Sequence, residues 1–391
     1  MSGNDVLITG IGLISCLGEG PDVNWAGLRS ESGPLVDTET FAPYTVHPLS
    51  GEIDWSLQIP RKEQRQMEQW QRIGTYTAGL ALQDAGIKDN EELTASMDMI
   101  VAAGGGERDV SVDTQILEAS RTRNDRDVML NEKLTTELRP TLFLAQLSNL
   151  LAGNISIVHK VTGSSRTFMG EEGAGISAIK TALARIRSGQ SSHILVGGAL
   201  NAEHKDICLS YELGGFLKHD GWAPIWSREN SSGGGVITGS GAAFLVLESR
   251  DHAEKRGART YAKLSAVSGN QASRKGDLEA SITSVLDEAG RQADIVISGT
   301  SGATEATSAE RSALSKRGDK SVRAFAGHTG HMKEAQFPFA VALAALAVAK
   351  GEGLPPLDAA FEVAASAKVE SALALTVGYH RGEGAALVTK A

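Results

Sequence analysis

The sequence is poor in cysteine, has no excess of basic residues and contains no apolar run long enough to cross a membrane. Only Cys16 and Cys208 occur among 391 residues, and neither lies in a CxxC motif or a Cys/His cluster. We therefore expect free thiols in a reducing compartment, the cytoplasm, and the N-terminus lacks the pattern of a secretion signal. The 38 basic and 47 acidic residues give a formal charge of −9, which provides no overall attraction for nucleic acid or an anionic membrane. The most apolar run, 337–349, is shorter than a membrane span and predicts a buried helix.

The composition is that of a globular protein with a well-buried core. Hydrophobic residues make up 41% and charged residues 22%, and the 44 glycines follow no fixed period. The length allows two domains. A charged segment begins at residue 248, after which new strand and helix patterns start, so we place a boundary near residue 250 and predict domains 1–250 and 251–391. The segments 6–15 and 262–271 are faintly similar, which suggests two halves of similar topology.

Short apolar runs alternate with helical patterns along the chain, which predicts an α/β fold with strands covered on both faces. The helical segment that ends before Gly189 has one apolar face. The clearest predicted strands are 5–9, 99–104, 193–198, 243–248, 294–299 and 373–378, and the predicted helices are 62–85, 172–187, 304–316 and 336–350.

The segment RTFMGEEGAGISAI, residues 166–179, predicts a strand that turns sharply through glycines into a helix. A catalytic nucleophile often lies at such a turn. Here the turn carries Glu171 and Glu172 and neither serine nor cysteine, so its chemistry needs another explanation.

Two glycine-rich segments resemble nucleotide-binding loops but lack their defining residues. Gly10 and Gly12 follow a strand, yet Ser15 replaces the third glycine of the dinucleotide motif. The segment 231–246 lacks the GK[ST] of a phosphate loop. Gly10 and Gly12 are better interpreted as packing glycines. The segment 231–246 is better interpreted as a tight loop before a strand.

Two polar motifs have residue types that occur in catalytic or metal sites. His328 and His331 are three residues apart, but no third ligand of suitable spacing follows, and we expect neither a metal nor a cofactor. Ser298 follows a predicted strand and is a conceivable nucleophile with His331 as its base, but it lacks a GxSxG frame and an acidic partner. We expect a loop serine.

Several segments together resemble the β-ketoacyl-acyl carrier protein synthases, the condensing enzymes of the thiolase superfamily. Residues 6–20 (VLITGIGLISCLGEG) are similar to the family's opening, 59–87 to its first long helix, 226–264 to the stretch that joins its two halves, and GHTGH at 327–331 to a family motif. The shared order of these matches between residues 5 and 388 supports the resemblance. It implies a five-layered α-β-α-β-α fold of two duplicated halves.

The resemblance also implies a catalytic cysteine at the turn, with two histidines, or a histidine and a lysine, for malonyl decarboxylation. Glu172 stands at the cysteine position, Ser298 at the first histidine and Ala326 at the lysine, while His331 matches the second histidine. A glutamate would form a reactive mixed anhydride, so condensation through Glu172 is not expected. The glutamate either imitates an anionic or occupied site or simply fills it.

The resemblance therefore points to a degenerate member like the chain-length-factor subunits of polyketide synthases. Our leading hypothesis is a non-catalytic partner that forms a heterodimer with an intact synthase. The alternatives are an active synthase or acyltransferase that uses a set such as Glu172 and His331, and a homodimer that binds acyl chains or carrier protein without turnover. We predict dimerisation through an edge strand at 193–198, and docking of acyl carrier protein on Arg61, Lys62, Arg65 and Arg72.

Overall fold

Two sets of strands make up the main sheet of the protein, and each set comes from a different part of the chain. The computed structural model describes residues 5–270, 276–290, 292–319, 321–365 and 368–391. The first set has the spatial order β5–β4–β6–β8–β1. Its first three strands are parallel, and β8 and β1 follow in antiparallel pairs. The bounds are β1 (Val6–Ser15), β4 (Asp98–Ala102), β5 (Ser165–Phe168), β6 (His193–Leu200) and β8 (Gly241–Ser249).

The second set repeats this arrangement in the order β11–β10–β12–β13–β9, with the same sequence of parallel and antiparallel pairs. β1 and β9 are the first strands of their sets, and they pair with each other where the sets meet. The predicted duplication is thus visible in the topology, although Gln271 of the second similar segment lies outside the described residues. The domain division at residue 250 stays a prediction. The bounds are β9 (Ala262–Asn270), β10 (Ile295–Ser298), β11 (Val322–Ala324), β12 (Ser371–Val377) and β13 (Glu383–Thr389).

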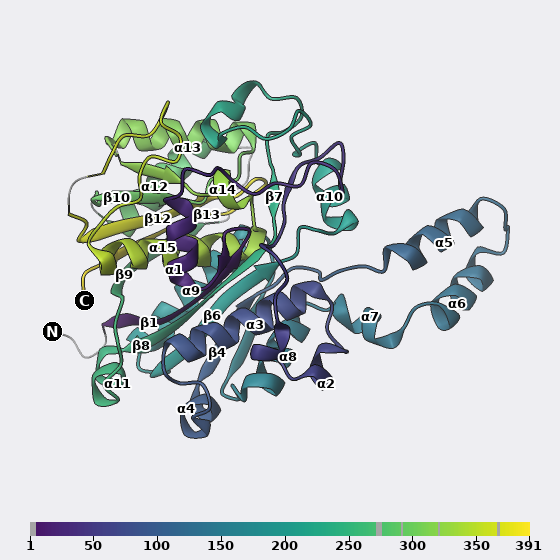
Figure 1. Ribbon diagram of the computed structural model, residues 1–391, viewed down its shortest axis with the longest axis horizontal. Coiled ribbons are helices and arrows are strands. Elements are labelled where there is room, and N and C mark those ends of the chain that lie inside the picture. Colours follow the sequence, from purple (N-terminus) through teal and green to yellow (C-terminus); the bar gives the residue numbers. More distant parts are fainter. Residues whose placement is uncertain (1–4, 271–275, 291, 320, 366–367) are drawn as a thin grey trace.

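The helices form three layers around these two sets of strands (Figure 1). α9 (Glu172–Arg187) and α15 (Gln336–Lys350) lie between the sets and share one hydrophobic core with both. α3 (Gln69–Asp84) and α8 (Asn149–His159) cover the outer face of the first set, and α12 (Leu278–Ala289) and α13 (Thr304–Arg317) cover the second. The predicted five-layered α-β-α-β-α fold is confirmed.

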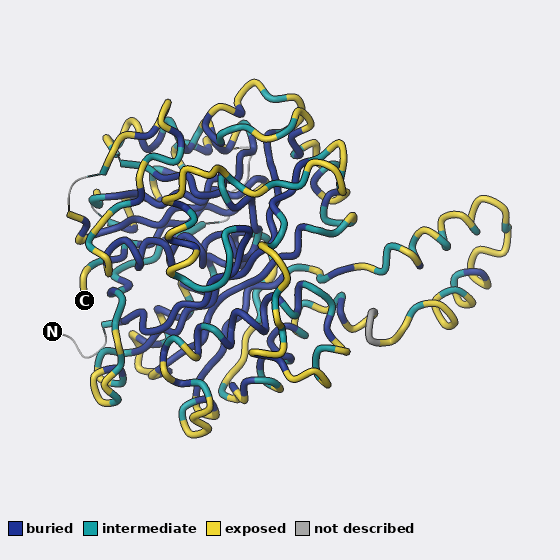
Figure 2. Tube along the Cα trace, in the orientation of Figure 1, coloured by how far each residue is buried: buried dark blue, intermediate teal, exposed yellow. Residues whose placement is uncertain are grey.

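An arm of helices projects from the body beside α8 (Figure 1). It consists of α5 (Val110–Ser120), α6 (Arg126–Thr136) and α7 (Pro140–Ala145). Figure 2 shows that most of its length is exposed or half-buried. The exposed residues include large apolar side chains, namely Leu117, Val128, Leu134, Phe143 and Leu144. The sequence patterns did not predict this arm.

Short elements connect the layers. The helices are α1 (Pro21–Leu28), α2 (Arg61–Gln64), α4 (Glu91–Ser96), α10 (Lys205–Glu212), α11 (Arg250–Lys255) and α14 (Ala326–Thr329). The 3-10 turns are η1 (Trp55–Leu57), η2 (Ile225–Asn230) and η3 (Lys333–Ala335), and the two-residue strands are β2 (Gly18–Glu19), β3 (Val46–His47) and β7 (Thr238–Gly239). No helix in the described part of the chain combines the length and the apolar composition that crossing a bilayer requires.

The predicted helix at 62–85 is wrong in one respect, because the chain leaves the helix after α2 and starts a new one at α3. Glu68 and Gln71 form a capping box, in which each side chain accepts from the other residue's backbone N–H. This box satisfies amide groups at the start of α3 and makes a separate N-terminus favourable. The helices predicted at 172–187 and 336–350 match α9 and α15 to the residue.

The prediction that 193–198 is an edge strand is also wrong. These residues belong to β6, which is paired with β4 on one side and β8 on the other, so its backbone groups are bonded in both directions. β5 is the terminal strand of the first set, since β4 is its only strand partner in the described part of the chain. β5 leads directly to the sharp turn before α9.

The packing interpretation of the first glycine motif is confirmed. A Cβ atom on Gly12 would lie 2.2 Å from the carbonyl oxygen of Thr77, and one on Gly10 would lie 2.5 Å from that of Ala81. Both contacts are far too short, so β1 requires glycine where α3 crosses it.

Candidate active site

The predicted strand, turn and helix around Glu172 are all present. β5 ends at Phe168, Gly170 has φ +122° and Glu171 has φ 59° and ψ −137°. That conformation is costly for a residue with a side chain, and such strain is found mainly where a site requires it. The turn places Glu172 at the first position of α9.

Glu172 is fully buried, and donors converge on its carboxylate. Its Oε1 lies 2.5 Å from Nε2 of His331 and accepts a hydrogen bond of 3.0 Å from the backbone N–H of Tyr379. Burial, the largest single influence, raises the pKa of Glu172. The charge of His331 and the backbone amides of Glu172 and Tyr379 together outweigh it and hold the pKa below its ordinary value. Glu172 is therefore an anion at neutral pH.

His331 is fixed by backbone and side-chain contacts. Its N–H donates to the carbonyl of Ile237, and its carbonyl accepts from Gly239, at 2.8 and 3.0 Å. Its Nδ1 lies 2.9 Å from the hydroxyl of Tyr211. Since its other ring nitrogen faces Glu172, the imidazole is held between a phenol and a carboxylate.

Tyr379 is a further site residue that the sequence patterns did not indicate. Its hydroxyl donates to Glu171 at 2.9 Å, and its ring lies 4.6 Å from that of Tyr211 and 5.6 Å from that of His331, between ring centroids. Burial and the nearby charges of Glu171 and Glu172 raise its pKa, so the hydroxyl stays protonated. Its position just after β12 was the available signal, because loops at strand ends often carry functional groups.

Ser298 is not the loop serine that the sequence predicted. It is the buried last residue of β10, its hydroxyl donates to Glu310 and it accepts from the N–H of Thr300 at 3.1 Å. Burial raises the pKa of Glu310 to about 7, against the opposing hydrogen bonds from Ser298 and Thr300. In the described part of the chain, Ser298 has no hydrogen bond with His331 or Glu172, so the serine–histidine pair considered from sequence does not form. Glu310 was detectable as a carboxylate on the buried face of a helix.

Ala326 provides no charge near the site. It begins α14, and its methyl group packs with Ile225, Trp226 and Ala324. The backbone N–H of Phe325 donates to the carbonyl of Ser298 at 3.2 Å, so these two predicted positions are neighbours. The structure thus joins Glu172 directly to His331 and leaves Ser298 and Ala326 as a second, separate group.

Neither cysteine lies at the turn before α9. Cys16 is buried with its thiol donating to the carbonyl of His328 at 3.0 Å, and burial raises its pKa to about 12. Burial also raises the pKa of Cys208, to about 11. Both thiols are protonated at neutral pH, and in the described residues neither contacts Glu172. Within the same residues, no group of three or more His, Cys, Asp or Glu side chains has the arrangement of a metal site.

The residues predicted to bind carrier protein lie near the break between α2 and α3. Arg61, Lys62 and Arg65 are exposed. Arg72 is half-buried, and its guanidinium donates to the carbonyl of Gln64 at 3.0 and 3.3 Å. The first three side chains are free to meet an acidic partner, whereas Arg72 also ties α3 to α2.

A family model described as "Beta-ketoacyl synthase, N-terminal domain" matches residues 3–253. The chain belongs to the β-ketoacyl synthase family. Its fold is accordingly the thiolase-like fold of that family.

Curated members of the family match at low identity over about two thirds of this chain. The 3-oxoacyl-[acyl-carrier-protein] synthase 2 of Vibrio cholerae is 26% identical over 274 residues, which cover 68% of this chain and 62% of that protein. The ketoacyl synthase beta subunit of the tetracenomycin polyketide synthase of Streptomyces glaucescens is 26% identical over 270 residues, covering 65% and 61%. The chain thus spans about three fifths of the length of these family members.

Solved ketosynthase structures match over almost the whole chain. The ishigamide ketosynthase/chain length factor superposes with a TM-score of 0.79 at 22% identity, covering 99% of both chains. A type II polyketide synthase acyl-carrier protein in complex with its ketosynthase bound to the hexaketide (AntDE:AntF) gives 0.74 at 16% identity, again covering 99% of both. At these identities the likeness establishes the fold alone.

Proposed function

We propose that this family member is a non-catalytic subunit that pairs with an intact ketoacyl synthase in fatty acid or polyketide synthesis. The observation that carries the proposal is the state of Glu172. The resemblance places it at the position of the nucleophile, and in the structure it is fully buried and held as an anion by His331 and by backbone amides.

The chemistry of that position supports a filled site. Condensation needs a thiolate that receives an acyl group and donors that stabilise the negative oxygen formed during transfer. Glu172 cannot hold an acyl group as a stable thioester, and its own Oε1 already takes the bonds of Tyr379 and His331. The side chain thus occupies the place where a reacting oxygen would be stabilised.

The surface offers a region for a partner subunit. β5 exposes the unpaired side of a sheet, and large apolar side chains such as Leu117 and Val128 are exposed on the arm. A sheet edge and an apolar surface of this kind are normally covered. We therefore propose that β5 and the arm, and not residues 193–198, contact the partner subunit. A homodimer would cover the same surfaces, and the preference for an intact synthase rests on Glu172, because a homodimer would contain no thiolate site.

Acyl carrier protein is the second partner in the proposal. The relatives named above include synthases named for that carrier and one ketosynthase in complex with it. Carrier proteins are acidic, and Arg61, Lys62 and Arg65 give this chain an exposed basic group despite its formal charge of −9. We place the subunit in the cytoplasm, where its two free cysteines would stay reduced.

One arrangement favours an active enzyme as the competing function. The series Tyr211, His331 and Glu172 has the spacing of an acid–base relay. A condensation and acyl-transfer assay with the purified chain, free of host synthase, separates the two functions. We expect no turnover above background from the wild type. Turnover that is lost in Glu172→Ala would establish the enzyme and contradict the proposal.

A further inference from the structure

A small cavity lies next to the Glu172 cluster, where β4 and β6 end. Its volume is about 60 Å³, and it is closed on one side by η3. Lys333 connects it to the candidate active site, because its Nζ lies 4.9 Å from the ring centroid of Tyr211. The side chains and glycines that line it include Trp70, Gly105, Glu107, Asn201, Lys333 and Glu334.

Glu334 is the most unusual of these residues. It is only 3% exposed, yet in the described part of the chain no other residue donates a hydrogen bond to its carboxylate or pairs with it within 4 Å. A Cβ atom on Gly104 would lie 2.9 Å from its Oε1, so glycine there leaves room for the carboxylate. Burial raises its pKa, against the opposing charge of Lys333. Its own backbone N–H is the one hydrogen-bond donor to this carboxylate among the described residues, so acceptor capacity is left facing the cavity.

Glu107 brings a second carboxylate to the same cavity. Its Oε1 accepts from the N–H of Trp70 at 2.9 Å and from the amide of Asn201 at 2.7 Å. Its other oxygen accepts no hydrogen bond from the described residues. Burial raises its pKa as well. Both carboxylates thus have acceptor capacity left in one partly open cavity.

The charges around the cavity do not balance. Glu107 and Glu334 line it, and Glu171 and Glu172 are near enough to Glu334 to affect its ionisation. Lys333 is the lining residue with a positive charge, and its ammonium lies against the ring of Tyr211. A ligand that donates hydrogen bonds and carries positive charge would match this surplus of acidic groups and favour their ionised form. An apolar acyl chain would leave both carboxylates unsatisfied.

We propose that this cavity binds a small organic ammonium ion, held by Glu334 and Glu107. The described residues contain no group of three acidic, histidine or cysteine ligands that would favour a metal ion instead. The volume of about 60 Å³ corresponds to roughly four to six water positions, which suits a cation of about that many non-hydrogen atoms. The site is independent of the proposed partner role.

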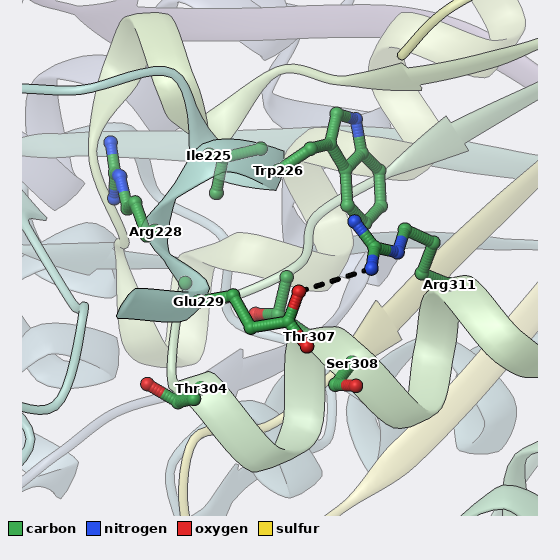
Figure 3. Close-up of a pocket in the computed structure, with 9 residues that line it drawn as sticks. Ile225, Trp226, Arg228, Glu229, Thr304, Thr307, Ser308 and Arg311 are labelled. Atoms are coloured by element: carbon green, nitrogen blue, oxygen red, sulfur yellow. Dashed lines mark hydrogen bonds and ion pairs between the residues drawn. The ribbon is translucent and has the colours of Figure 1, made fainter. Parts of the chain in front are cut away.

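A second cavity, between η2 and α13, lacks these features (Figure 3). Its Glu229 and Arg311 pair with each other at 3.1 Å. The guanidinium of Arg228 points away from Thr304 and Thr307 and donates to backbone carbonyls. The charges of Glu229 and Arg311 are therefore matched to each other, whereas Nη2 of Arg228 has no hydrogen-bond partner among the described residues.

The test is a calorimetric and ligand-observed NMR titration of the full chain with n-propylammonium chloride at pH 7.5 and constant ionic strength. We expect saturable binding at one site, with no binding of the neutral isostere propan-1-ol at tenfold higher concentration. Glu334→Gln keeps the shape and removes the charge, and it should weaken binding at least tenfold. Equal binding of propan-1-ol, or an unchanged affinity in Glu334→Gln, would overturn the proposal, as would the absence of saturable binding.

Matched variants protect the result against misfolding. Glu107→Gln should also weaken binding, and Gly105→Ala should do so by narrowing the cavity, since a Cβ there meets no atom within 4 Å. Glu118→Gln, an exposed change on α5, should leave the affinity unchanged. If Glu334→Gln does not fold, the affinities of Glu107→Gln and Gly105→Ala for propylammonium test the proposal. Full displacement of propylammonium by an equal concentration of potassium would show a general cation site and contradict the proposal.

Discussion

At the scale of single residues, the centre of the molecule is a buried anion where the resemblance to condensing enzymes places a thiolate. Glu172 and His331 are both fully buried and 2.5 Å apart. Burying two charged groups is favourable only when each keeps its partner, and removing one partner typically costs about 3–5 kcal/mol. Removal of the Glu172 carboxylate alone should therefore destabilise the fold.

The pH dependence of stability tests this pair. Because the folded-state pKa of Glu172 is lowered, its contribution is present above the unfolded pKa of about 4.3 and is lost as pH falls through the folded value. Urea unfolding should show Glu172→Gln to be about 3–5 kcal/mol less stable than the wild type at pH 7, with a smaller gap at pH 4. Glu118→Gln is the control. A gap that stays constant between pH 7 and pH 4 would mean that Glu172 is not charged in the fold.

A shortened side chain should leave an anion site behind. In Glu172→Ala the N–H of Tyr379 and the imidazole of His331 lose their acceptor, so acetate should bind there. At tenfold excess over its dissociation constant, acetate should stabilise the variant by about 1.4 kcal/mol, measured by thermal unfolding. Acetamide should stabilise the variant less than acetate does, and acetate should not stabilise the wild type. An equal response of variant and wild type to acetate would refute a freed site.

The sequence allowed part of this site to be predicted. The resemblance named Glu172 and His331 as one possible set at the site, and the structure brings them to 2.5 Å from each other. Tyr379 and Glu310 were missed because their partners lie 207 and 12 residues away in the sequence, and their local signals, a place after a strand and on a helix face, do not identify those partners. Ser298 was misjudged for the same reason, since its partner Glu310 lies on another element.

At the scale of elements, local signals were reliable where one pattern dominates. α9 was predicted to the residue because its apolar periodicity agrees with the glycine that follows it, and α15 because a continuous apolar run ends just before Gly351. β6 was wrongly placed at an edge because an apolar run does not reveal its neighbours in the sheet. The α2 to α3 break was missed, although Glu68 and Gln71 have the spacing of a capping box.

The capping box should contribute measurable stability. Glu68→Ala removes the acceptor for the backbone N–H of Gln71 in the first turn of α3 and should cost about 1 kcal/mol in chemical unfolding. Glu118→Ala, an exposed change within α5, should cost only a few tenths. Equal effects of the two changes would show that the box contributes nothing specific.

The basic group at α2 should influence carrier binding. Reversing Arg61 and Arg65 to Glu should weaken binding of acyl carrier protein to the subunit or its complex at least tenfold at low salt, because attraction becomes repulsion. Lys255→Glu, an exposed change on α11, is the matched control. Unchanged affinity by surface plasmon resonance would place the docking site elsewhere or on the partner.

At the scale of the whole molecule, two halves of equal topology enclose α9 and α15 and leave β5 and the arm uncovered. The sequence predicted the five layers through the resemblance, since composition and periodicity indicate only an α/β fold. It gave no sign of the projecting arm, whose helices bury few residues and so lack a strong apolar stripe. The arm and β5 are the surfaces that a partner subunit would cover.

The central claim is that this subunit pairs with a catalytically intact synthase. Co-expression with a catalytically intact ketoacyl synthase from the same genome, followed by native mass spectrometry, tests the claim most directly. Wild type should give the heterodimer as the main species, and Leu117→Glu with Val128→Glu on the arm should reduce it at least tenfold, because charged side chains would have to be buried at the interface. Recovery of this chain only as a homodimer, with the synthase pairing solely with itself, would contradict the account.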